Sequence, residues 1–287
     1  MNRKIALVCD SAADFPPGVT EKLGLRILPV HIFVNGKDHL HGKTISNKEV
    51  ISNLRGKKNV YTSPFYPYEC TKMFDKLLED HDEVVSFHLS SQLSGNYKSA
   101  CSARNFMGKD DSGRVHIIDL GAVSISQGLL VRKAAGLLEE GVPAALLEKH
   151  LEQHKKDTFM AFTVDNLVWL KKGGRISAFN AFVGNMLNVK PIINLQDSRL
   201  MPVERHRGKK SSTEHLLSMA EKNYENLDGN CEVWMAYADN PEEVVAAREK
   251  LASAIDLPAE NIPMAELGAT ISVHTGPGSI FIAMAPK

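Results

Sequence analysis

Short apolar runs alternate with amphipathic helical stretches through the first half of the chain, and this alternation constrains the fold more than any other feature. Apolar runs typical of buried strands occupy residues 4–10, 25–33, 83–89 and 114–118. Apolar residues at helical spacing occupy 94–106 and 124–139. Such alternation predicts βα units on a mainly parallel sheet with flanking helices. After the first strand, Ser11-Ala12-Ala13-Asp14 resembles a capping box, so we expect a helix to begin there.

The second half changes character around residues 158–163, where short strands bounded by turns begin to dominate. Predicted strands span 159–164, 189–194, 232–238, 262–267 and 279–284, and predicted helices span 212–226 and 241–255. With 287 residues, the chain is long enough for two domains. We predict an N-terminal α/β domain over residues 1–160 and a C-terminal α/β domain over residues 161–287.

The balance of charges limits the partners of the chain. Its 34 basic residues match its 34 acidic residues, and neither sign forms a long run. The basic surface that nucleic-acid binding needs is therefore not expected. The first apolar run reaches Asp10 too soon for a signal-peptide core or a membrane span. We expect a cytoplasmic protein without an integral membrane segment.

Cysteines and histidines do not predict a metal centre. The four cysteines are scattered without a Cys-x-x-Cys pair, which favours neither a zinc site nor a disulfide framework. The closest histidine pairs, His39 with His41 and His150 with His154, have no third ligand near them in the sequence. We expect no metal and no cofactor.

Hydroxyl side chains gather at three predicted strand-to-helix turns: Asp10-Ser11, Thr62-Ser63-Pro64 and residues 90–97. Open parallel sheets bind ligands outside the carboxyl ends of their strands, where helix N-termini favour anions. Ser94 is expected as a helix N-cap, and Gly95 would let a ligand approach the backbone closely. Two interpretations stay open, because these hydroxyls suit either an anion site or helix caps alone.

Two further turns carry side chains suited to an anion. Residues 167–177 predict a short helix that ends at glycine, and this ending leaves Arg175 unexplained and open to carboxylate or phosphate recognition. The glycine-proline turn at 273–279 carries His274 at its mouth. Either His274 is structural or it donates a hydrogen bond to a buried anion.

Enzyme functions find less support in the sequence. No Gly-x-Ser-x-Gly elbow occurs, and no signal pairs a histidine with Ser94 as its base, although a serine-dependent acyl hydrolase remains an alternative. The chain also lacks the spacing of a phosphate-binding P-loop, and no Gly-x-Gly-x-x-Gly follows a strand. Nucleotide binding by this chain is therefore unsupported.

Five motifs in this order resemble the DegV family over nearly the whole chain. They are Asp10-Ser11-x-x-Asp14, Thr62-Ser63-Pro64, Ser90-Ser91-x-Leu93-Ser94-Gly95-x-Tyr97-x-Ser99-Ala100, Leu170-Lys171-Lys172-Gly173-Gly174-Arg175-Ile176-Ser177 and His274-Thr275-Gly276-Pro277-Gly278. The resemblance implies a two-domain fold with a mainly antiparallel sheet in the C-terminal domain and one fatty acid at the domain junction. It further implies a non-catalytic lipid-binding subunit of a bacterial fatty-acid kinase system. Such a subunit presents the carboxylate to a separate ATP-dependent subunit, whose acyl-phosphate product enters phospholipid metabolism.

The resemblance also implies roles for individual residues. Thr62 and Ser94 match hydroxyls that contact the carboxylate, with neighbours at Ser63, Gly95 and His274. Arg175 and Arg207 match positions on the carboxylate side or in docking of the kinase. A fatty acid of about 14 to 18 carbons is expected, because an apolar tunnel of this kind would rarely stay empty in the cell. Its tail sets the affinity, since each buried methylene contributes about 0.8 kcal/mol. A lipid sensor acting through a protein partner is the alternative within the same binding class.

The chain departs from the family pattern in two regions. Thr62-Ser63-Pro64-Phe65-Tyr66 stands where members usually read Thr-Ser-Gln-Pro-Ser, which predicts a different path after Ser63. Asp119-Leu120 replaces an Asp-Ser pair, and Ser126 replaces a usual glycine. We therefore expect one wall of the pocket to differ from the family pattern.

Overall fold

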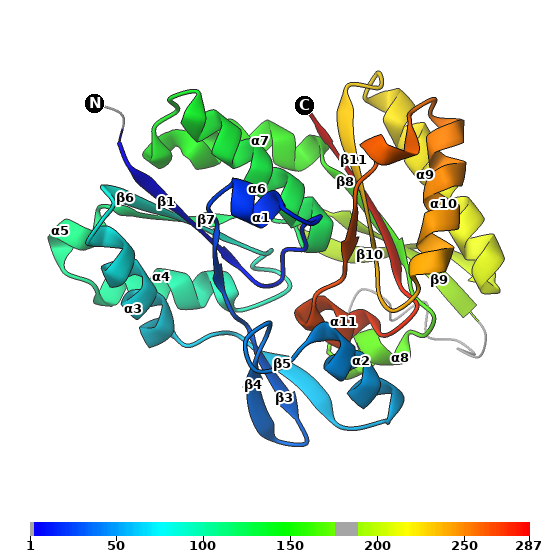
Figure 1. Ribbon diagram of the computed structural model, residues 1–287, viewed down its shortest axis with the longest axis horizontal. Coiled ribbons are helices and arrows are strands. Elements are labelled where there is room, and N and C mark those ends of the chain that lie inside the picture. Colours follow the sequence, from blue (N-terminus) through cyan, green and yellow to red (C-terminus); the bar gives the residue numbers. More distant parts are fainter. Residues whose placement is uncertain (1–2, 176–188) are drawn as a thin grey trace.

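The computed structural model describes residues 3–175 and 189–287. Within these residues the strands form a four-stranded parallel sheet, a six-stranded mainly antiparallel sheet and a small three-stranded antiparallel sheet. Helices lie on both faces of the two larger sheets, and one pair of helices lies between the sheets (Figure 1). The predicted fold class is therefore confirmed.

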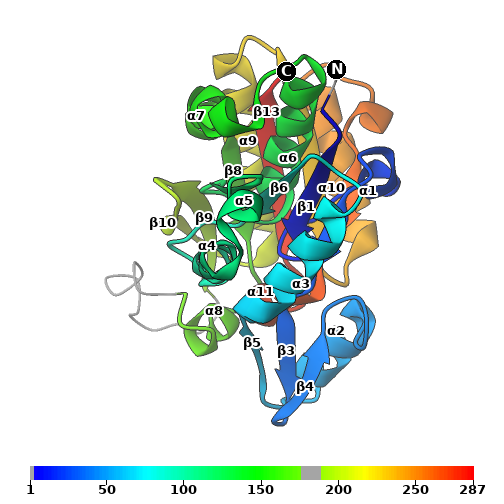
Figure 2. The same cartoon turned by 90° about the vertical axis from the view of Figure 1, so that its left-hand side faces the viewer.

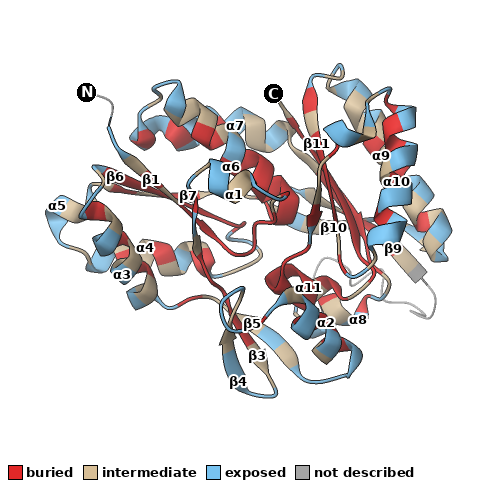
Figure 3. Cartoon of the chain, viewed as in Figure 1, coloured by how far each residue is buried: buried red, intermediate tan, exposed pale blue. Residues whose placement is uncertain are grey.

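The parallel sheet has the order β2-β1-β6-β7. Its strands are β2 (Arg26–Leu28), β1 (Ile5–Asp10), β6 (Glu83–His88) and β7 (Val115–Asp119). Its flanking helices are α3 (Pro67–Leu78) and α4 (Asn96–Phe106) on one face, and α6 (Ser124–Glu139) and α7 (Leu147–Asp157) on the other. Strand β6 is buried along its whole length (Figure 3), with Val84 packed toward α3 and α4 and Val85 toward α6 and α7. Burial of both faces explains why the apolar residues of this strand do not alternate with exposed polar ones, and why its polar residues Ser86 and His88 are buried as well.

The six-stranded sheet has the order β10-β9-β8-β13-β11-β12 and is antiparallel except between β11 and β12. Its strands are β8 (Phe159–Thr163), β9 (Val189–Gln196), β10 (Arg199–Arg207), β11 (Cys231–Tyr237), β12 (Met264–Glu266) and β13 (Ile280–Pro286). Helices α9 (Lys209–Asn226) and α10 (Pro241–Ala254) cover its outer face. Along β13, Ile282 faces these helices and Phe281 faces α6, so alternate residues of one strand enter two separate cores.

The three-stranded sheet was not predicted, and one predicted strand was wrong because of it. The run at 25–33 is divided between β2 and β3 (His31–Val34), with Pro29 between them, a residue that has no N–H for a sheet hydrogen bond. Strand β4 (Lys37–Leu40) follows β3 through Asn35-Gly36, both with positive φ (49° and 82°), a hairpin signal present in the sequence. Strand β5 (Val60–Ser63) completes this sheet, which projects beside α2 (Asn47–Arg55) (Figure 2).

Helix α11 (Ala269–Thr275) was also missed, because only a turn was predicted near His274. The helix has only seven residues and is buried almost throughout, with apolar and polar residues both buried, so its sequence shows no amphipathic helical periodicity. The remaining helices are short: α1 (Val19–Lys22), α5 (Lys109–Ser112) and α8 (Val168–Lys172), with 3-10 turns at Ala144–Leu146 and Ala259–Asn261.

Several long elements agree closely with the prediction. Helix α6 has the predicted bounds, and α10 begins at the predicted Pro241. Strand β8 is the first of the six-stranded sheet along the chain, so the predicted domain boundary at 160/161 falls inside this strand; the division into domains stays a prediction. None of the described helices has the length and apolar character needed to cross a membrane.

Two glycines of α6 test how tightly this helix is packed between the sheets. A Cβ at Gly128 would lie 2.6 Å from the carbonyl oxygen of Asp14 and 2.9 Å from the ring of Trp234, whereas a Cβ at Gly136 would meet nothing within 4 Å. We expect Gly128→Ala to lower the free energy of unfolding by about 1–3 kcal/mol through overpacking. Gly136→Ala, the matched control, should raise it by roughly 0.5–1 kcal/mol through helix propensity. Equal effects in urea denaturation would contradict this packing.

Candidate functional site

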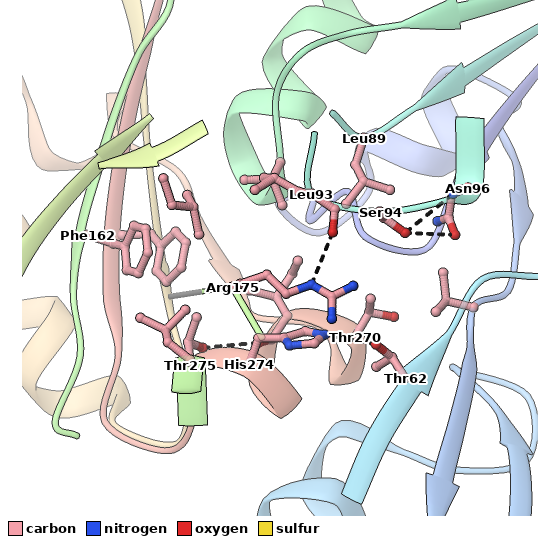
Figure 4. Close-up of a pocket in the computed structure, with 16 residues that line it drawn as sticks. Thr62, Leu89, Leu93, Ser94, Asn96, Phe162, Arg175, Thr270, His274 and Thr275 are labelled. Atoms are coloured by element: carbon pink, nitrogen blue, oxygen red, sulfur yellow. Dashed lines mark hydrogen bonds between the residues drawn. The ribbon is translucent and has the colours of Figure 1, made fainter. Parts of the chain in front are cut away.

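A narrow cavity lies between the carboxyl end of the parallel sheet and the inner face of the six-stranded sheet. Its volume is about 60 Å³. Residues from both halves of the chain line it, including Leu89 after β6, Phe162 on β8 and His274 on α11 (Figure 4). The lining also contains Val30, Thr62, Leu93, Ser94, Asn96, Val123, Leu170, Arg175, Leu200, Thr270, Ile271, Thr275 and Phe281.

One end of the cavity is apolar. The rings of Phe162 and Phe281 are stacked there, with centroids 4.3 Å apart and planes inclined by 9°. Leu170 and Leu200 add aliphatic surface to the lining. This end of the cavity suits a hydrocarbon chain, because none of the described residues that line it there is charged.

Thr62 and His274 form part of the polar end. The Thr62 Oγ1 and the His274 Nε2 are 2.9 Å apart, which joins strand β5 to helix α11. Burial, and then the charge of Arg175, lower the pKa of His274 to about 3. The ring is therefore neutral at physiological pH and offers one N–H donor and one lone pair.

Gly173 gives His274 the room that it occupies. A Cβ at Gly173 would overlap Nδ1 of His274, and that nitrogen has no hydrogen-bond partner among the described atoms. The glycine in the predicted helix ending thus serves close packing of the ring as well as chain reversal. The sequence indicated the reversal but not the packing, because the ring arrives from a distant segment.

Arg175 brings a positive charge to the polar end. Its Nε donates to the carbonyl oxygen of Leu93 at 3.1 Å, and its Nη1 donates to that of Gly173. Within residues 3–175 and 189–287, no acidic side chain forms an ion pair with it. Burial lowers the pKa of Arg175 below its ordinary value, but a guanidinium stays charged in proteins. Figure 4 shows the guanidinium directed toward Thr62 and Ser94.

Ser94 completes the polar end, although not as the expected N-cap. Helix α4 begins at Asn96 with Gly95 at the N-cap position, and the Ser94 hydroxyl donates to the Asn96 side chain at 3.2 Å. Gly95 does not line the cavity; a Cβ there would lie 3.1 Å from Pro64, so the glycine permits close packing of two loops. No described histidine forms a hydrogen bond with Ser94.

A surface depression of about 600 Å³ adjoins the polar end. It shares Leu93, Ser94 and Arg175 with the cavity, and Tyr97 and Lys98 of α4 also line it. The charged end of the cavity therefore lies next to the outside, whereas the stacked phenylalanines lie at the inner end.

Asp10 and Asp14 position the loops that carry these side chains. Asp10 accepts hydrogen bonds from the backbone N–H groups of Ala12 and Leu89, which ties the ends of β1 and β6 together. Asp14 accepts from the Ser124 hydroxyl at 2.6 Å and from the Gly268 N–H at 2.7 Å.

The capping box predicted at Ser11-Ala12-Ala13-Asp14 is therefore wrong. The helix that follows begins only at Val19, because Asp14 bonds to distant segments instead of a local helix start.

The remaining predicted residues lie outside the cavity lining. Ser63 on β5 is half-buried and its hydroxyl donates to the carbonyl oxygen of Pro64. Arg207 is exposed at the end of β10, so its proposed docking role stays a prediction. Ile176 and Ser177 of the family motif fall outside the described residues.

The residues that depart from the family pattern, at 64–66, 120 and 126, do not line the cavity. Phe65 is buried against Phe74 in the core beside α3, and the Ser126 hydroxyl donates within the first turn of α6 to the carbonyl oxygen of Val123 at 2.7 Å. Of this region, only Val123 lines the cavity.

Thr270 lines the cavity but was not predicted from the sequence. Its hydroxyl lies 2.8 Å from the His41 ring, and no local sequence pattern marks it.

Comparison with known proteins identifies the family of the chain. A family model described as an uncharacterised protein of the DegV family matches residues 4–287. The chain belongs to the DegV family. A DegV domain-containing protein of Deinococcus radiodurans is 31% identical over 283 residues, 98% of each chain.

Solved structures of DegV proteins share the whole fold. A fatty-acid-binding DegV family protein from Thermus thermophilus is 32% identical, with a TM-score of 0.88 over 99% of this chain and 100% of the other. A stearic-acid-binding protein from Eubacterium ventriosum is 27% identical, with a TM-score of 0.90 over 99% of this chain and 98% of the other. A fatty-acid-binding DegV from Bacillus subtilis, 26% identical, has a TM-score of 0.85 over 99% of this chain and 100% of the other.

The neutral state of His274 is testable by titration. Its pKa of about 3 predicts no change of its ring NMR signals between about pH 5 and 8, where an ordinary histidine titrates. Because the folded pKa lies below the unfolded one, the stability contributed by the neutral ring is lost as pH falls below about 6.5. The His274→Gln variant assigns the signal. Arg175→Gln should raise the pKa only in part, since burial is the larger cause, and a wild-type midpoint near 6.5 would contradict the prediction.

Proposed function

We propose that this chain is a cytoplasmic carrier that binds one long-chain fatty acid and presents the carboxylate to a separate ATP-dependent kinase subunit. The observation that carries the proposal is the charge of Arg175, half-buried in a largely apolar cavity and not ion-paired with any described acidic side chain. Such a charge is stabilised when an anion enters beside it. The fatty-acid-binding relatives from Thermus thermophilus and Eubacterium ventriosum support the same ligand class.

The hydrocarbon tail supplies most of the binding free energy. Burying about fifteen methylenes is worth on the order of 12 kcal/mol before the entropy of association is subtracted. The cavity volume of about 60 Å³ is small for such a tail. Ligand cavities usually have about 300–1,000 Å³, so the apolar walls must separate when a chain of roughly 14 to 18 carbons enters. Leu93, Leu170 and Leu200 belong to three different segments of the lining, which allows such movement.

The carboxylate binds at the polar end. If the His274 Nε2–H donates to the Thr62 oxygen, the Thr62 hydroxyl proton is free to donate to the ligand. Arg175 supplies the opposite charge, and the Ser94 hydroxyl can turn from Asn96 to the ligand. Each charge-assisted hydrogen bond of this kind contributes about 1.5–3 kcal/mol. The head group therefore determines the orientation of the acid.

The position of the polar end supports presentation to a partner. Ser94 and Arg175 line both the cavity and the open depression beside it, so the carboxylate lies next to the surface. A kinase subunit that docks over this depression would reach the carboxylate without removing the tail. The chain then needs no catalytic residue of its own.

Two alternatives make different demands on the site. A serine-dependent acyl hydrolase needs a base on its serine, whereas the Ser94 hydroxyl donates to Asn96. A chromogenic ester incubated with the pure protein tests that alternative directly. A lipid sensor would bind the same acid but would pass the signal to a regulatory protein, and the wild type would then be inactive with kinase subunits.

The carboxylate site is tested by comparing an acid with its alcohol. Bound lipid is first removed from the purified protein by extraction and identified by mass spectrometry. The lipid-free protein should then bind oleate. Arg175→Met and Ser94→Ala should each weaken oleate binding by roughly ten- to a hundredfold, the loss of about 1.5–3 kcal/mol. Binding of oleyl alcohol should change far less, because the alcohol carries no charge. Calorimetric titration measures both ligands.

Two variants serve as controls for this comparison. The Ser102 hydroxyl on α4 donates to the backbone of Lys98, away from the cavity, so Ser102→Ala should leave oleate affinity unchanged. Arg175→Lys keeps the charge and should keep part of the affinity. If Arg175→Met and Ser94→Ala lose affinity equally for the acid and the alcohol, the polar end does not bind the carboxylate. If the wild type takes up no fatty acid, the proposed function fails.

Arg207 separates docking from binding. It is exposed at the end of edge strand β10 and does not line the cavity, so Arg207→Ala should bind fatty acid normally. Acyl-phosphate formation with a cognate kinase subunit should fall about tenfold or more, which corresponds to about 1.4 kcal/mol. Higher salt should weaken the wild-type pairing in the same direction, since exposed charges are screened.

The matched control for docking is Arg26, an exposed arginine on edge strand β2 of the parallel sheet. Arg26→Ala should support phosphorylation at the wild-type rate. An Arg207→Ala protein that is phosphorylated equally fast would show that this arginine takes no part in docking.

A further inference from the structure

Two histidines and a glutamate meet where edge strand β10 contacts the start of helix α9. One ligand atom from each of Glu204, His206 and His215 lies within 4.8 Å of the others, and no other such group of three occurs among residues 3–175 and 189–287. The Nε2 of His206 is 2.9 Å from Oε2 of Glu204. The rings of His206 and His215 face each other with centroids 4.0 Å apart.

The backbone brings these three residues together for local reasons. Glu204 and His206 are two residues apart on β10 and therefore point to the same face of the strand, the face that α9 covers. Gly208, with φ of 87°, reverses the chain between β10 and α9. The reversal returns the first two turns of α9 over the strand, so His215 faces His206.

Ser211 orients both imidazole rings. The Nδ1 of His215 is 3.0 Å from the carbonyl oxygen of Ser211, which requires Nδ1–H and leaves a lone pair on Nε2. The Nδ1 of His206 is 3.2 Å from the Ser211 hydroxyl. When a metal ion binds Nε2 in place of the hydrogen bond between Nε2 and Glu204, the ring proton moves to Nδ1 and this hydroxyl accepts its hydrogen bond. In metal sites the second ring nitrogen of a ligating histidine commonly donates to a carbonyl or hydroxyl oxygen in this way, and that bond fixes the ring orientation.

Neighbouring positive charges are directed away from the three side chains. Arg205 and Arg207 point to the opposite face of β10, because side chains alternate along a strand. The ammonium group of Lys209 is held by Glu243 and Asp165. The cluster therefore keeps its own carboxylate available for a cation.

We propose that Glu204, His206 and His215 form a binding site for Zn²⁺. Two imidazole nitrogens and one carboxylate oxygen are a ligand set that zinc prefers and that magnesium and calcium, which take oxygen ligands, do not. Zinc bonds of about 2.0–2.2 Å place ligand atoms at most about 4.4 Å apart, so small side-chain rotations complete the geometry. A water fills the fourth position. The ion joins the edge strand to α9, and its three ligands do not line the fatty-acid cavity. The sequence predicted no metal, because the third ligand comes from another element.

The test uses the full chain without a histidine tag, stripped with a chelator and titrated with Zn²⁺ against a chromogenic zinc indicator. We expect one ion per chain. His206→Ala and His215→Ala should each weaken binding by more than about tenfold, since even loss of a partner of a ligand costs about 10–100-fold. Co²⁺ added instead of Zn²⁺ should give the visible absorption bands of a four-coordinate site in the wild type and not in these two variants.

His150 is the matched control, because it is also an exposed helical histidine whose Nδ1 bonds to the carbonyl oxygen four residues earlier, at 2.9 Å. His150→Ala should bind Zn²⁺ like the wild type. Zn²⁺ should raise the melting temperature of the wild type and not that of Glu204→Gln, which keeps the size of the side chain and so guards against misfolding. No binding by the wild type, or equal loss in His150→Ala, would overturn the proposal.

Discussion

The hydrogen bond between Asp14 and the backbone at the start of helix α11 is the interaction on which the cavity depends. Its carboxyl accepts from Ser124 on α6 and from the backbone of Gly268, so one side chain joins the first loop of the chain to two distant segments. Helix α11 then carries Thr270, Ile271, His274 and Thr275 into the lining. Burial raises the pKa of Asp14 to about 7 despite these two donors, which shows how completely the contact is enclosed. Gly268 allows this approach, because a Cβ there would lie 2.8 Å from Asp14.

The polar end combines one charge with neutral partners. A half-buried guanidinium without an ion-pair partner among the described side chains is unfavourable by itself. A second charge on His274 would add repulsion, and the low pKa of this ring avoids that. In the proposed function, the carboxylate of the ligand supplies the negative charge opposite this guanidinium. The apolar remainder of the lining is the reason why the proposed anion has a hydrocarbon tail.

Strand β10 connects the proposed functions outside the cavity. Its alternation directs Glu204 and His206 toward α9 and directs Arg205 and Arg207 to the opposite face. Leu200, earlier on the same strand, lines the cavity. A metal ion that joins this strand to α9 would hold the strand that contributes both to the lining and to the proposed docking surface. The strand lies at the edge of its sheet, where fewer backbone contacts restrain it.

The sequence by itself determined the βα alternation, the bounds of α6 and the residues Thr62, Ser94, Arg175 and His274, which all line one cavity. Local patterns suffice for elements whose apolar spacing is regular and for motifs whose residues are contiguous. Only the tertiary structure decided that His274 lies on a helix and bonds to Thr62, 212 residues away, and that Asp14 holds Gly268 rather than capping a nearby helix. The tertiary structure also showed that Ser63, Gly95 and Arg207 do not line the cavity. The physical reason is that burial and hydrogen bonding in the cavity depend on segments far apart in the chain, and no local pattern records which of them meet.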